Sequence, residues 1–326
     1  MNDTAGVIIC AFTPDRWTDL KRAVDSVVSQ RPPPTEVIVV IDHHDELLHR
    51  AQARWPSRLN DGDLRLLPRV VSSVGSPGLS GARNTGVAAS TADIVFFLDD
   101  DATATKGWLA SLLPHYEDAG VLACGGAAVP HLAVPRPSWW PPEFDWIVGC
   151  SYIGMPTEPA RIRNLIGANM SVRRSSVLDL GGFSESMGRV GSTPLGCEET
   201  DLFIRLARRW PNARIIYEPS ATVSHSVPAP RLTWSYFSAR CYAEGVSKAR
   251  LTARVGSTRA LSSERRYATR TLPAGIGRGV IGGIRGHPRE ALPAIAIIAG
   301  LAITTAGYLW GWLTFRAVRL EAIRGP

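Results

Sequence analysis

The sequence predicts an α/β fold, with a doubly wound, mostly parallel sheet that carries helices on both faces and a C-terminal hydrophobic helix. Over the first 125 or so residues, short apolar runs alternate with stretches whose apolar residues recur at helical spacing. The apolar runs are continuous, which is typical of parallel strands covered on both faces. From Ala291 onward, roughly 25 residues carry no charge, enough for a helix to cross a ~30 Å hydrocarbon core.

The N-terminal part shows this alternation most clearly. In chain order, the expected elements are a strand at 6–12, a helix ending at Gln30, a strand at 36–42, a weaker helix at 45–55 and a short strand at 64–67. The prolines at 32–34 end the first helix, because proline cannot continue a helical hydrogen-bond pattern. The second strand ends in a carboxylate, Asp42. A glycine-rich turn at 75–84 then opens a helix that runs to about Ser90; it is either a flexible loop or a phosphate-binding helix start, to which Arg83 adds charge.

The most informative stretch is the strand that ends in three consecutive acids. Residues 94–98 are apolar, and Asp99, Asp100 and Asp101 follow without a break. A buried strand cannot hold unpaired carboxylates, so these acids are expected just past its carboxyl end, where open α/β sheets bind ligands. Clustered carboxylate oxygens suit Mg²⁺ or Mn²⁺. The alternative interpretation is a solvated acidic turn.

The middle of the chain changes character. The expected regular elements are a helix at 106–118, strands at 120–124 and 167–172, a short helix from 177 to 180, and strand pieces at 213–217 and 221–225. Between them, residues 130–159 are rich in Pro and Trp and predict an irregular excursion across the mouth of the site. Its aromatic rings either stack on sugar rings or rest at a lipid interface, or they pack the loop down. His225 ends the last strand piece and either reaches the same metal or is an ordinary surface or core histidine.

A second acid cluster opens the helix that begins near residue 198. Acids in a first helical turn are favoured by the helix dipole. Glu198, Glu199 and Asp201 put three acids within four residues, which exceeds what the dipole explains. A carboxylate in such a group is a candidate general base.

The tail combines basic and apolar segments. A helix is expected at 232–250, a basic, loop-like segment at 254–289, and then the uncharged stretch, with Tyr308, Trp310 and Trp312 near one end. Such aromatic residues are typical of a membrane interface, so membrane association is the preferred interpretation. The alternative is a buried helical hairpin, broken at Gly300 or Gly307, that serves a subunit interface.

The composition indicates the chemical class of the binding partner and the cellular compartment of the chain. The net charge of +7 indicates an acidic partner, such as a nucleotide-linked substrate, anionic lipid or nucleic acid. Nucleic acid is the least favoured, because the basic segment adjoins an apolar span and lacks stacked aromatics, so that anionic headgroups fit it better. Five widely spaced cysteines without a C-x-x-C pair favour a reducing cytosol. The N-terminal apolar run is too short and lacks the basic flank expected of a signal peptide.

Three motifs together resemble a known family. Phe-Leu-Asp-Asp-Asp at 97–101, Ala-Arg-Asn at 82–84 and Cys-Glu-Glu-Thr-Asp-Leu at 197–202, in this order, resemble the family 2 glycosyltransferases of GT-A fold over about residues 5–245. The resemblance implies inverting transfer of a sugar from a nucleotide-diphosphate donor, dependent on Mg²⁺ or Mn²⁺. Membrane-associated members that act on polyprenyl-linked sugars are similar in outline.

The resemblance also implies roles for individual residues. The nucleotide sugar would be bound by Ala11, Phe12, Pro14, Asp42, Arg83, Asp99 and Asp100. Asp101 would hold the metal, with Asp99 and His225 as further candidate ligands. The base that deprotonates the acceptor would be Glu199, Glu198 or Asp201, a choice left open because Glu199 stands where the family usually has Asp.

The resulting hypothesis is a metal-dependent glycosyltransferase at the cytoplasmic face of the cell membrane, whose acceptor is a lipid-linked sugar or a cell-surface glycan precursor. Its expected domains are a catalytic domain at 1–250, a basic juxtamembrane segment at 251–290, and a hydrophobic helix with a basic end at 291–326. Homo-oligomers are compatible with this hypothesis. The alternative functions are a nucleotidyl- or phosphotransferase using the same metal site and a non-catalytic, membrane-bound scaffold.

Overall fold

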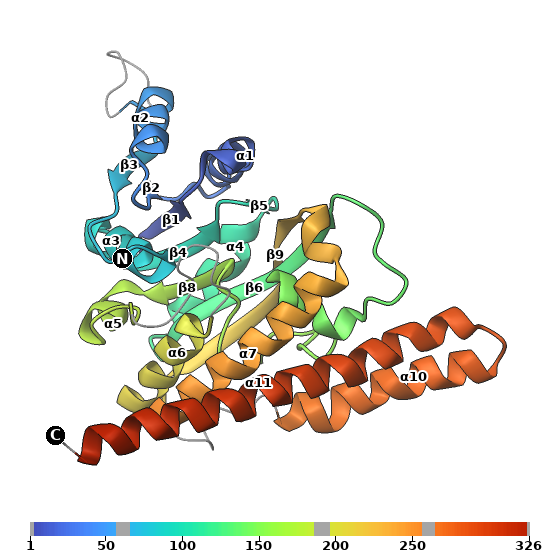
Figure 1. Cartoon of the computed structure of the whole chain (residues 1–326). Helices are drawn as coiled ribbons and strands as arrows, with labels where there is room; N and C mark the ends of the chain where they lie inside the picture. Colours follow the sequence, from blue (N-terminus) through green and yellow to red (C-terminus); the bar gives the residue numbers. More distant parts are fainter. Residues whose placement is uncertain (1–2, 57–65, 186–195, 256–264, 325–326) are drawn as a thin grey trace. The chain divides into compact units, whose positions relative to one another are not determined.

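A computed structural model describes residues 3–56, 66–185, 196–255 and 265–324 (Figure 1). The chain divides into two compact units. Unit 1 comprises Met1–His131, Pro156–Gly191 and Glu198–Ser226, and unit 2 comprises Leu132–Met155, Ser192–Cys197 and Val227–Pro326.

One sheet organises unit 1. Its strands are β1 (Ala5–Ala11), β2 (Glu36–Ile41), β3 (Arg69–Ser72), β4 (Ile94–Asp99), β5 (Ala102–Ala104), β6 (Val121–Leu132), β7 (Ala160–Arg161), β8 (Asn169–Arg173) and β9 (Arg214–Val227). Among the described residues, the strand order is β3-β2-β1-β4-β8-β6-β9-β5, and β7 pairs with β9. The β3-β2-β1-β4 half is parallel, whereas β8 runs antiparallel to both β4 and β6, and β5 and β7 run antiparallel to β9. The α/β class is confirmed, and the sheet is mixed because its second half is antiparallel.

Helices cover both faces of this sheet, as the continuous apolar runs predicted. The helices of unit 1 are η1 (Pro14–Arg16), α1 (Trp17–Val28), α2 (Asp45–Arg54), α3 (Leu79–Ala89), α4 (Trp108–Leu112), η2 (Leu113–Glu117), α5 (Arg174–Asp179) and α6 (Glu198–Arg209). Alternate residues of β1 face opposite cores: Ile9 packs with the apolar faces of α1, α2 and α4, and Ile8 packs with those of α3, α5 and α6. Each buried strand therefore contributes to two cores, which explains why its sequence shows no polar alternation.

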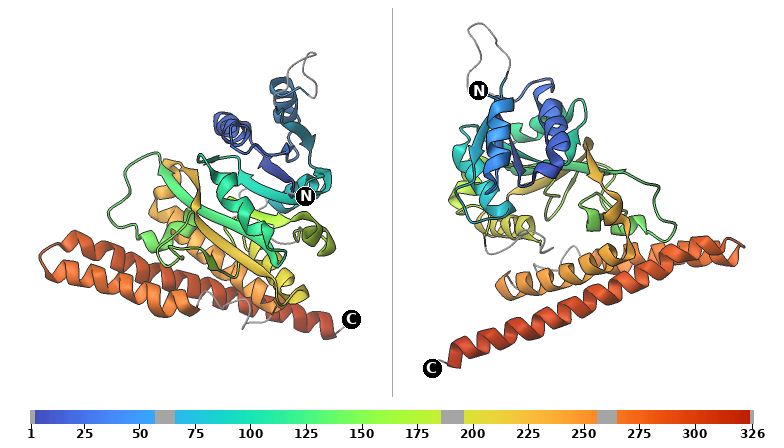
Figure 2. Two further views of the ribbon diagram at one scale, coloured as in Figure 1. Left: turned by 180° about the vertical axis from the view of Figure 1, so that it is seen from behind. Right: turned by 45° about the horizontal axis from the view of Figure 1, so that its top comes forward.

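Helices dominate unit 2. Within the described part of this unit they are η3 (Pro142–Val148), η4 (Ala229–Leu232), α7 (Trp234–Val255), η5 (Tyr267–Thr271), α10 (Leu272–Ile284), η6 (Pro288–Glu290) and α11 (Ala291–Arg324). Helices α10 and α11 form a hairpin, and α11 also packs along α7 (Figures 1 and 2). The core of this unit is aromatic: the Phe237 ring lies 5.6 Å from that of Trp140 and 5.3 Å from that of Phe144. Trp140 and Phe144 thus pack the segment at 130–159 down, which was one of the interpretations left open.

Several expected elements differ from those observed. The strand expected at 64–67 lies partly outside the described residues, and the strand of this region is β3 at 69–72. The two late strand pieces form one continuous strand, β9. The expectation of a loop-like segment at 254–289 is wrong for its described residues from 265 onward, where most are helical. Glycines in α10 allow close contact with α11, since a Cβ added to Gly279 would lie 2.7 Å from that of Ala294.

Candidate functional site

The site residues predicted at the ends of β1, β2 and β4 gather at one edge of the sheet because these strands are parallel. Cys10 of β1 pairs with Asp99 of β4, and Ala11 pairs with Ile41 of β2. The segments after these strands therefore leave the sheet side by side. Phe12, Asp42 and the acids after Leu98 lie at these carboxyl ends, as the sequence predicted.

Asp99, Asp101 and His225 come together into a group that could hold a metal ion. One ligand atom from each residue lies within 4.8 Å of the other two. The Nε2 atom of His225 lies 3.2 Å from Asp101 Oδ1 and 3.9 Å from Asp99 Oδ2. Strand pairing explains the position of the histidine, since His225 of β9 stands opposite Ala102 of β5, directly after the acid run.

The donor set of this group fits a divalent cation. Two carboxylates and an imidazole are ligands that Mn²⁺ accepts, and the carboxylates also suit Mg²⁺. Burial would raise the pKa of Asp99, but the interaction with His225 and the charge of Arg83 outweigh it and keep the pKa below its usual value. Asp99 is therefore held in the charged form that binds a cation.

Asp100 belongs to a different pair. Its Oδ1 accepts a hydrogen bond from Arg16 Nη1 at 2.8 Å, and the same nitrogen lies 2.9 Å from Asp101 Oδ2. Burial raises the pKa of Asp100 to about 7, although the charge of Arg16 opposes this. Sequence reasoning did not assign a role to Arg16. The signal that could have found it is a basic residue just past the first strand, at the edge where the acids of β4 end.

The second acid cluster meets the first through one buried guanidinium. Arg83, on α3, is 2% exposed; its Nη1 atom lies 3.1 Å from Glu199 and 3.4 Å from Glu198, and its Nη2 atom lies 3.6 Å from Asp99. Burial would lower the pKa of Arg83, but these carboxylates outweigh it and raise the pKa above its usual value. Arg83 is thus a fixed positive charge between the two clusters.

Asp201 and the two glutamates have different surroundings. The side chain of Asp201 is fully buried, and its Oδ2 accepts a hydrogen bond from Arg205 Nε at 2.8 Å. The same guanidinium also donates to the carbonyls of Leu180 and Gly182. These contacts connect α6 to the loop that follows α5, so Asp201 is tied into the packing of the unit.

Four of the residues expected to bind the nucleotide, Ala11, Phe12, Pro14 and Asp42, end or closely follow strands β1 and β2. Asp42 Oδ2 accepts a hydrogen bond from the Gly78 N–H at 2.9 Å, whereas its buried Oδ1 has no hydrogen-bond partner among the described residues. Phe12 is 45% exposed and Ala11 is buried. Pro14 begins η1, where Thr13 provides the cap. An exposed ring and an unsatisfied acceptor are suited to stacking and to hydrogen bonding with a ligand.

Comparisons with known proteins identify the family. The family model described as glycosyl transferase family 2 matches residues 6–181. A glucosyl-dolichyl phosphate glucuronosyltransferase from Haloferax volcanii is 30% identical over 243 residues, which is 74% of this chain and 75% of that protein. A pre-mycofactocin glycosyltransferase from Mycobacterium tuberculosis is 34% identical over 154 residues, covering 46% of this chain and 30% of that protein.

Solved structures agree at the level of the fold. A mannosyltransferase from Pyrobaculum calidifontis, solved with GDP-Man and Mn²⁺, has a TM-score of 0.59 and 16% sequence identity, and the match covers 94% of this chain and 88% of that one. The expected GT-A type of fold is thereby confirmed. Because the family model matches more than half of the sequence and the Haloferax relative aligns along most of it, the chain belongs to glycosyl transferase family 2 and is a glycosyltransferase.

Proposed function

We propose that this glycosyltransferase moves a sugar from a nucleotide-diphosphate donor to the hydroxyl of a lipid-linked acceptor, in a metal-dependent reaction that inverts the anomeric centre. The observation that carries the proposal is the meeting of Asp99, Asp101 and His225 at the carboxyl edge of the sheet. The catalytic role of each residue named below is part of the proposal.

Asp101, Asp99 and His225 would hold the cation. A bound Mn²⁺ or Mg²⁺ would neutralise charge that develops on a departing diphosphate. Arg16 already lies against Asp100 and Asp101 and would add a second positive charge at the same place. The cation and Arg16 would therefore both favour loss of the anionic leaving group.

Asp42 and Phe12 would bind the nucleoside end. The unsatisfied Oδ1 of Asp42 can accept a hydrogen bond from a ribose hydroxyl or a base N–H, and the hydrogen bond from Gly78 holds the carboxylate in place. The exposed ring of Phe12 offers a surface on which a base can stack.

Glu199 is our choice for the general base. Its side chain is 19% exposed, compared with 5% for Glu198 and 0% for Asp201. An acceptor hydroxyl has to approach the base to within hydrogen-bond distance, so the most accessible of the three carboxylates fits best. Arg83 would position Glu199, and Glu198 would share that guanidinium.

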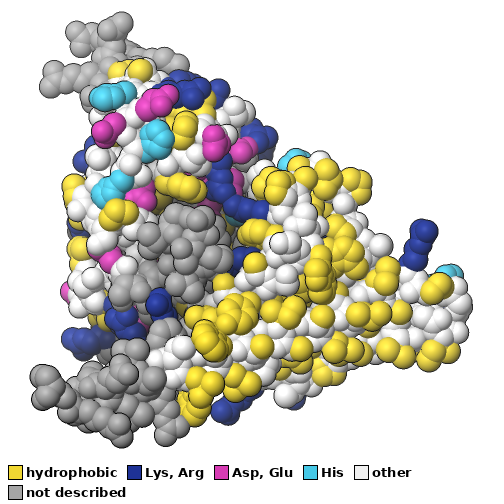
Figure 3. Space-filling model, viewed as in Figure 1, with side chains coloured by type: hydrophobic (Ala, Val, Ile, Leu, Met, Phe, Trp, Pro, Cys, Tyr) yellow, Lys and Arg dark blue, Asp and Glu magenta, His cyan; other side chains and the backbone are white. Residues whose placement is uncertain are grey.

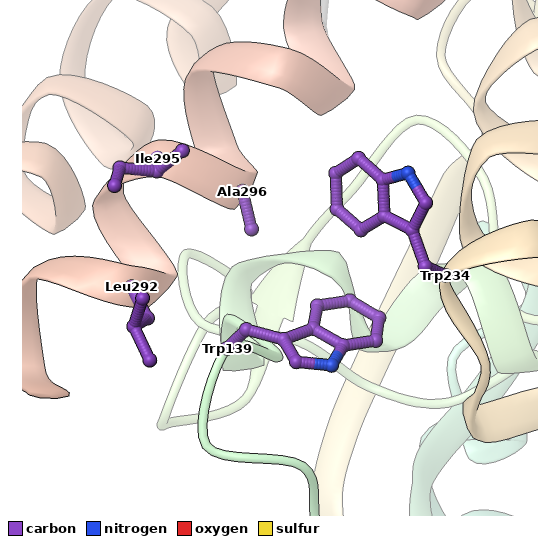
Figure 4. Close-up of a pocket in the computed structure, with 5 residues that line it drawn as sticks. All are labelled: Trp139, Trp234, Leu292, Ile295 and Ala296. Atoms are coloured by element: carbon purple, nitrogen blue, oxygen red, sulfur yellow. The ribbon is translucent and has the colours of Figure 1, made fainter.

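An apolar groove in unit 2 supports a lipid-linked acceptor. Its cavity volume is about 260 Å³, and it is lined by Trp139, Trp234, Leu292, Ile295 and Ala296 (Figure 4). The two indole rings meet edge to face with centroids 5.2 Å apart, and a hydrocarbon chain fits such a lining. The Haloferax relative is named for glucosyl-dolichyl phosphate, which is a lipid-linked sugar.

Membrane association supports the same acceptor class. The stretch Pro288–Thr314 is long and apolar enough to cross a membrane, and basic residues precede it. We place the enzyme at the cytoplasmic face of the cell membrane, where nucleotide sugars and anionic headgroups meet. The predicted division into a catalytic domain at 1–250, a basic segment at 251–290 and a hydrophobic helix at 291–326 stays part of this proposal.

A donor screen tests the proposed reaction. Nucleotide sugars are incubated with Mn²⁺ or Mg²⁺ and a polyprenyl-phosphate sugar, and nucleoside diphosphate release is measured together with the anomeric configuration of the product by NMR. We expect Asp101→Asn and Glu199→Gln each to lower turnover by at least about 100-fold, and Glu198→Gln to lower it less. Activity on a nucleoside triphosphate that requires Asp101 but not Glu199 would favour a nucleotidyl- or phosphotransferase. Absence of metal-dependent nucleotide binding would favour a scaffold.

The groove has its own test. Trp234→Ala should raise KM for the polyprenyl-linked acceptor and leave KM for a short-chain analogue unchanged. Val129→Ala provides the control, because Val129 is 48% exposed on β6 and does not line the groove. Equal effects of Trp234→Ala on both acceptors would contradict a role in binding the chain.

A further inference from the structure

The long apolar helix α11 is attached to α7 along much of its length. A Cβ added to Gly245 of α7 would lie 2.1 Å from the carbonyl oxygen of Thr304, and one added to Gly307 would lie 2.2 Å from that of Tyr242. One added to Gly311 would lie 2.9 Å from a side chain of α7. The two backbones therefore touch through glycines, as in closely packed helix pairs. Gly300, near the start of this contact, lies against Phe237, whereas Gly311 lies against Ala249, so the two helices run parallel.

Charged residues of α7 lie at the level of these contacts. Arg240, Glu244, Lys248 and Arg250 alternate along α7 with the residues that touch α11. Lys248 Nζ lies 3.3 Å from Glu244 Oε1. If α11 crossed a bilayer along Pro288–Thr314, its partner segment of α7 would be drawn into the hydrocarbon with these charges, which is costly. The packing of α11 therefore disfavours a spanning position.

The hairpin nevertheless exposes a large apolar surface. Ile284, at the end of α10, is 81% exposed, and on α11 Ile295, Ile298, Trp310 and Leu313 are 61%, 55%, 59% and 58% exposed. Figure 3 shows hydrophobic side chains along both helices of the hairpin. Exposed apolar surface of this extent marks an interaction site.

The charge of the hairpin indicates which partner covers that surface. Residues 272–314 of the hairpin contain three arginines, at 278, 285 and 289, and one glutamate. Arg285 and Arg289 are exposed in the turn between α10 and α11, next to Ile284. Apolar side chains beside exposed arginines, with tryptophans near one end, are the features by which helices bind in the plane of an anionic lipid surface.

We propose that the α10–α11 hairpin lies in the plane of one leaflet of an anionic bilayer and does not cross it. Both the turn at 285–290 and the end of α11 then face the same aqueous side. This arrangement leaves the charges of α7 in the headgroup region or in water while the apolar side chains enter the lipid. The inference rests on the membrane association within the proposed function and adds its topology.

Site-directed labelling of the full chain tests this topology. His287→Cys, in the turn, and Arg319→Cys, beyond the apolar stretch, are made separately, and the protein is added from outside to sealed phosphatidylglycerol-containing vesicles. A membrane-impermeant maleimide is applied before and after detergent, and the parent chain gives the background from the native cysteines. We expect both positions to be labelled fully without detergent. Protection of either position until detergent is added would show a spanning helix and overturn the proposal.

A charge substitution identifies the contact surface. Ile284→Glu should weaken vesicle binding at least 10-fold in a flotation assay. Leu178→Glu, on α5 in unit 1, is the matched control, because Leu178 is also an exposed apolar residue, at 45%, and should leave binding unchanged. If the chain instead formed dimers that hid the hairpin and ignored vesicles, the proposal would fail, whereas sugar transfer to a short-chain acceptor would still uphold the proposed reaction.

Discussion

Replacing Gly167 with alanine adds one methyl group that should displace the carboxylate of Glu199, the proposed base. The residue is buried, and a Cβ added to it would lie 2.0 Å from Glu199 Oε1 and 2.6 Å from Arg83 Nη2. Ordinary contact begins at 3.4 Å, so in Gly167→Ala the Glu199 carboxylate has to move by more than an ångström. Because Glu199 is partly exposed and Arg83 is buried, we expect the glutamate to yield.

The expected magnitudes differ for stability and for catalysis. The Arg83–Glu199 pair at 3.1 Å is lost, but Arg83 keeps Glu198 at 3.4 Å and Asp99 at 3.6 Å, so its buried charge remains compensated. Since Glu199 can enter water, the free energy of unfolding should fall by only about 1 kcal/mol, which lowers Tm by about 2 °C. A base displaced by about 1 Å should lower kcat by about 100-fold.

The assay measures nucleoside diphosphate release at saturating donor, alongside a thermal melt. Gly277→Ala is the control, because a Cβ at Gly277, on α10, meets nothing within 4 Å, and both turnover and Tm should be preserved. If Gly167→Ala turned over at the wild-type rate, Glu199 would not be the base. A large fall in Tm would show that Arg83 had been displaced instead of the glutamate.

Three further predictions concern the metal group, α6 and the response to acid. Mn²⁺ at about 100 times its Kd should stabilise the wild type by about 2.7 kcal/mol and leave Asp101→Asn unaffected in the same melt; equal stabilisation would place the cation elsewhere. Arg205→Met should lower the free energy of unfolding by about 3 kcal/mol, because it leaves the fully buried Asp201 without this partner, whereas Arg208→Met, at an exposed position on the same helix, should change it little in urea titrations. Burial would raise the pKa of Glu218, but hydrogen bonds from a neighbouring serine and a histidine hold it below its usual value. Because its pKa is lower in the folded state, ionised Glu218 stabilises the fold above its unfolded pKa of about 4.3, and this stabilisation is lost as the pH falls further. The difference in free energy of unfolding between the wild type and Glu218→Gln should therefore shrink between about pH 6 and pH 3. A difference that stays constant over this range would refute the prediction.

The apolar run and the cost of burying unpaired charge were sufficient to predict which end of the strand carries the acids. Asp99, Asp100 and Asp101 could be placed past a strand because their charges cannot be buried unpaired inside it. The role of Arg16 could not be predicted, because its contact with Asp100 requires β1 to lie next to β4, and sequence spacing does not specify strand order. His225 was left open for the same reason, since its position depends on the antiparallel pairing of β5 with β9.

Other differences arose where tertiary contacts override local preference. The glycines of α10 favour loops when the sequence is considered alone, yet here they allow two helices to approach closely. The tryptophans at 139 and 140 signalled an aromatic region, and only packing against Phe237 shows that Trp140 belongs to a core with Trp139 against it. The family resemblance predicted the roles to be tested, but the contacts of Asp201 and Glu199 distinguish two acids that the sequence presents as equivalent.

Arg83 lies between the proposed metal ligands and the proposed base. A cation held by Asp99 would weaken the attraction of that carboxylate for the guanidinium, and Arg83 would then pair more strongly with Glu199 and Glu198. Binding of the donor would in this way alter the surroundings of the residue that meets the acceptor. Steady-state kinetics should then show ordered binding, with the donor before the acceptor.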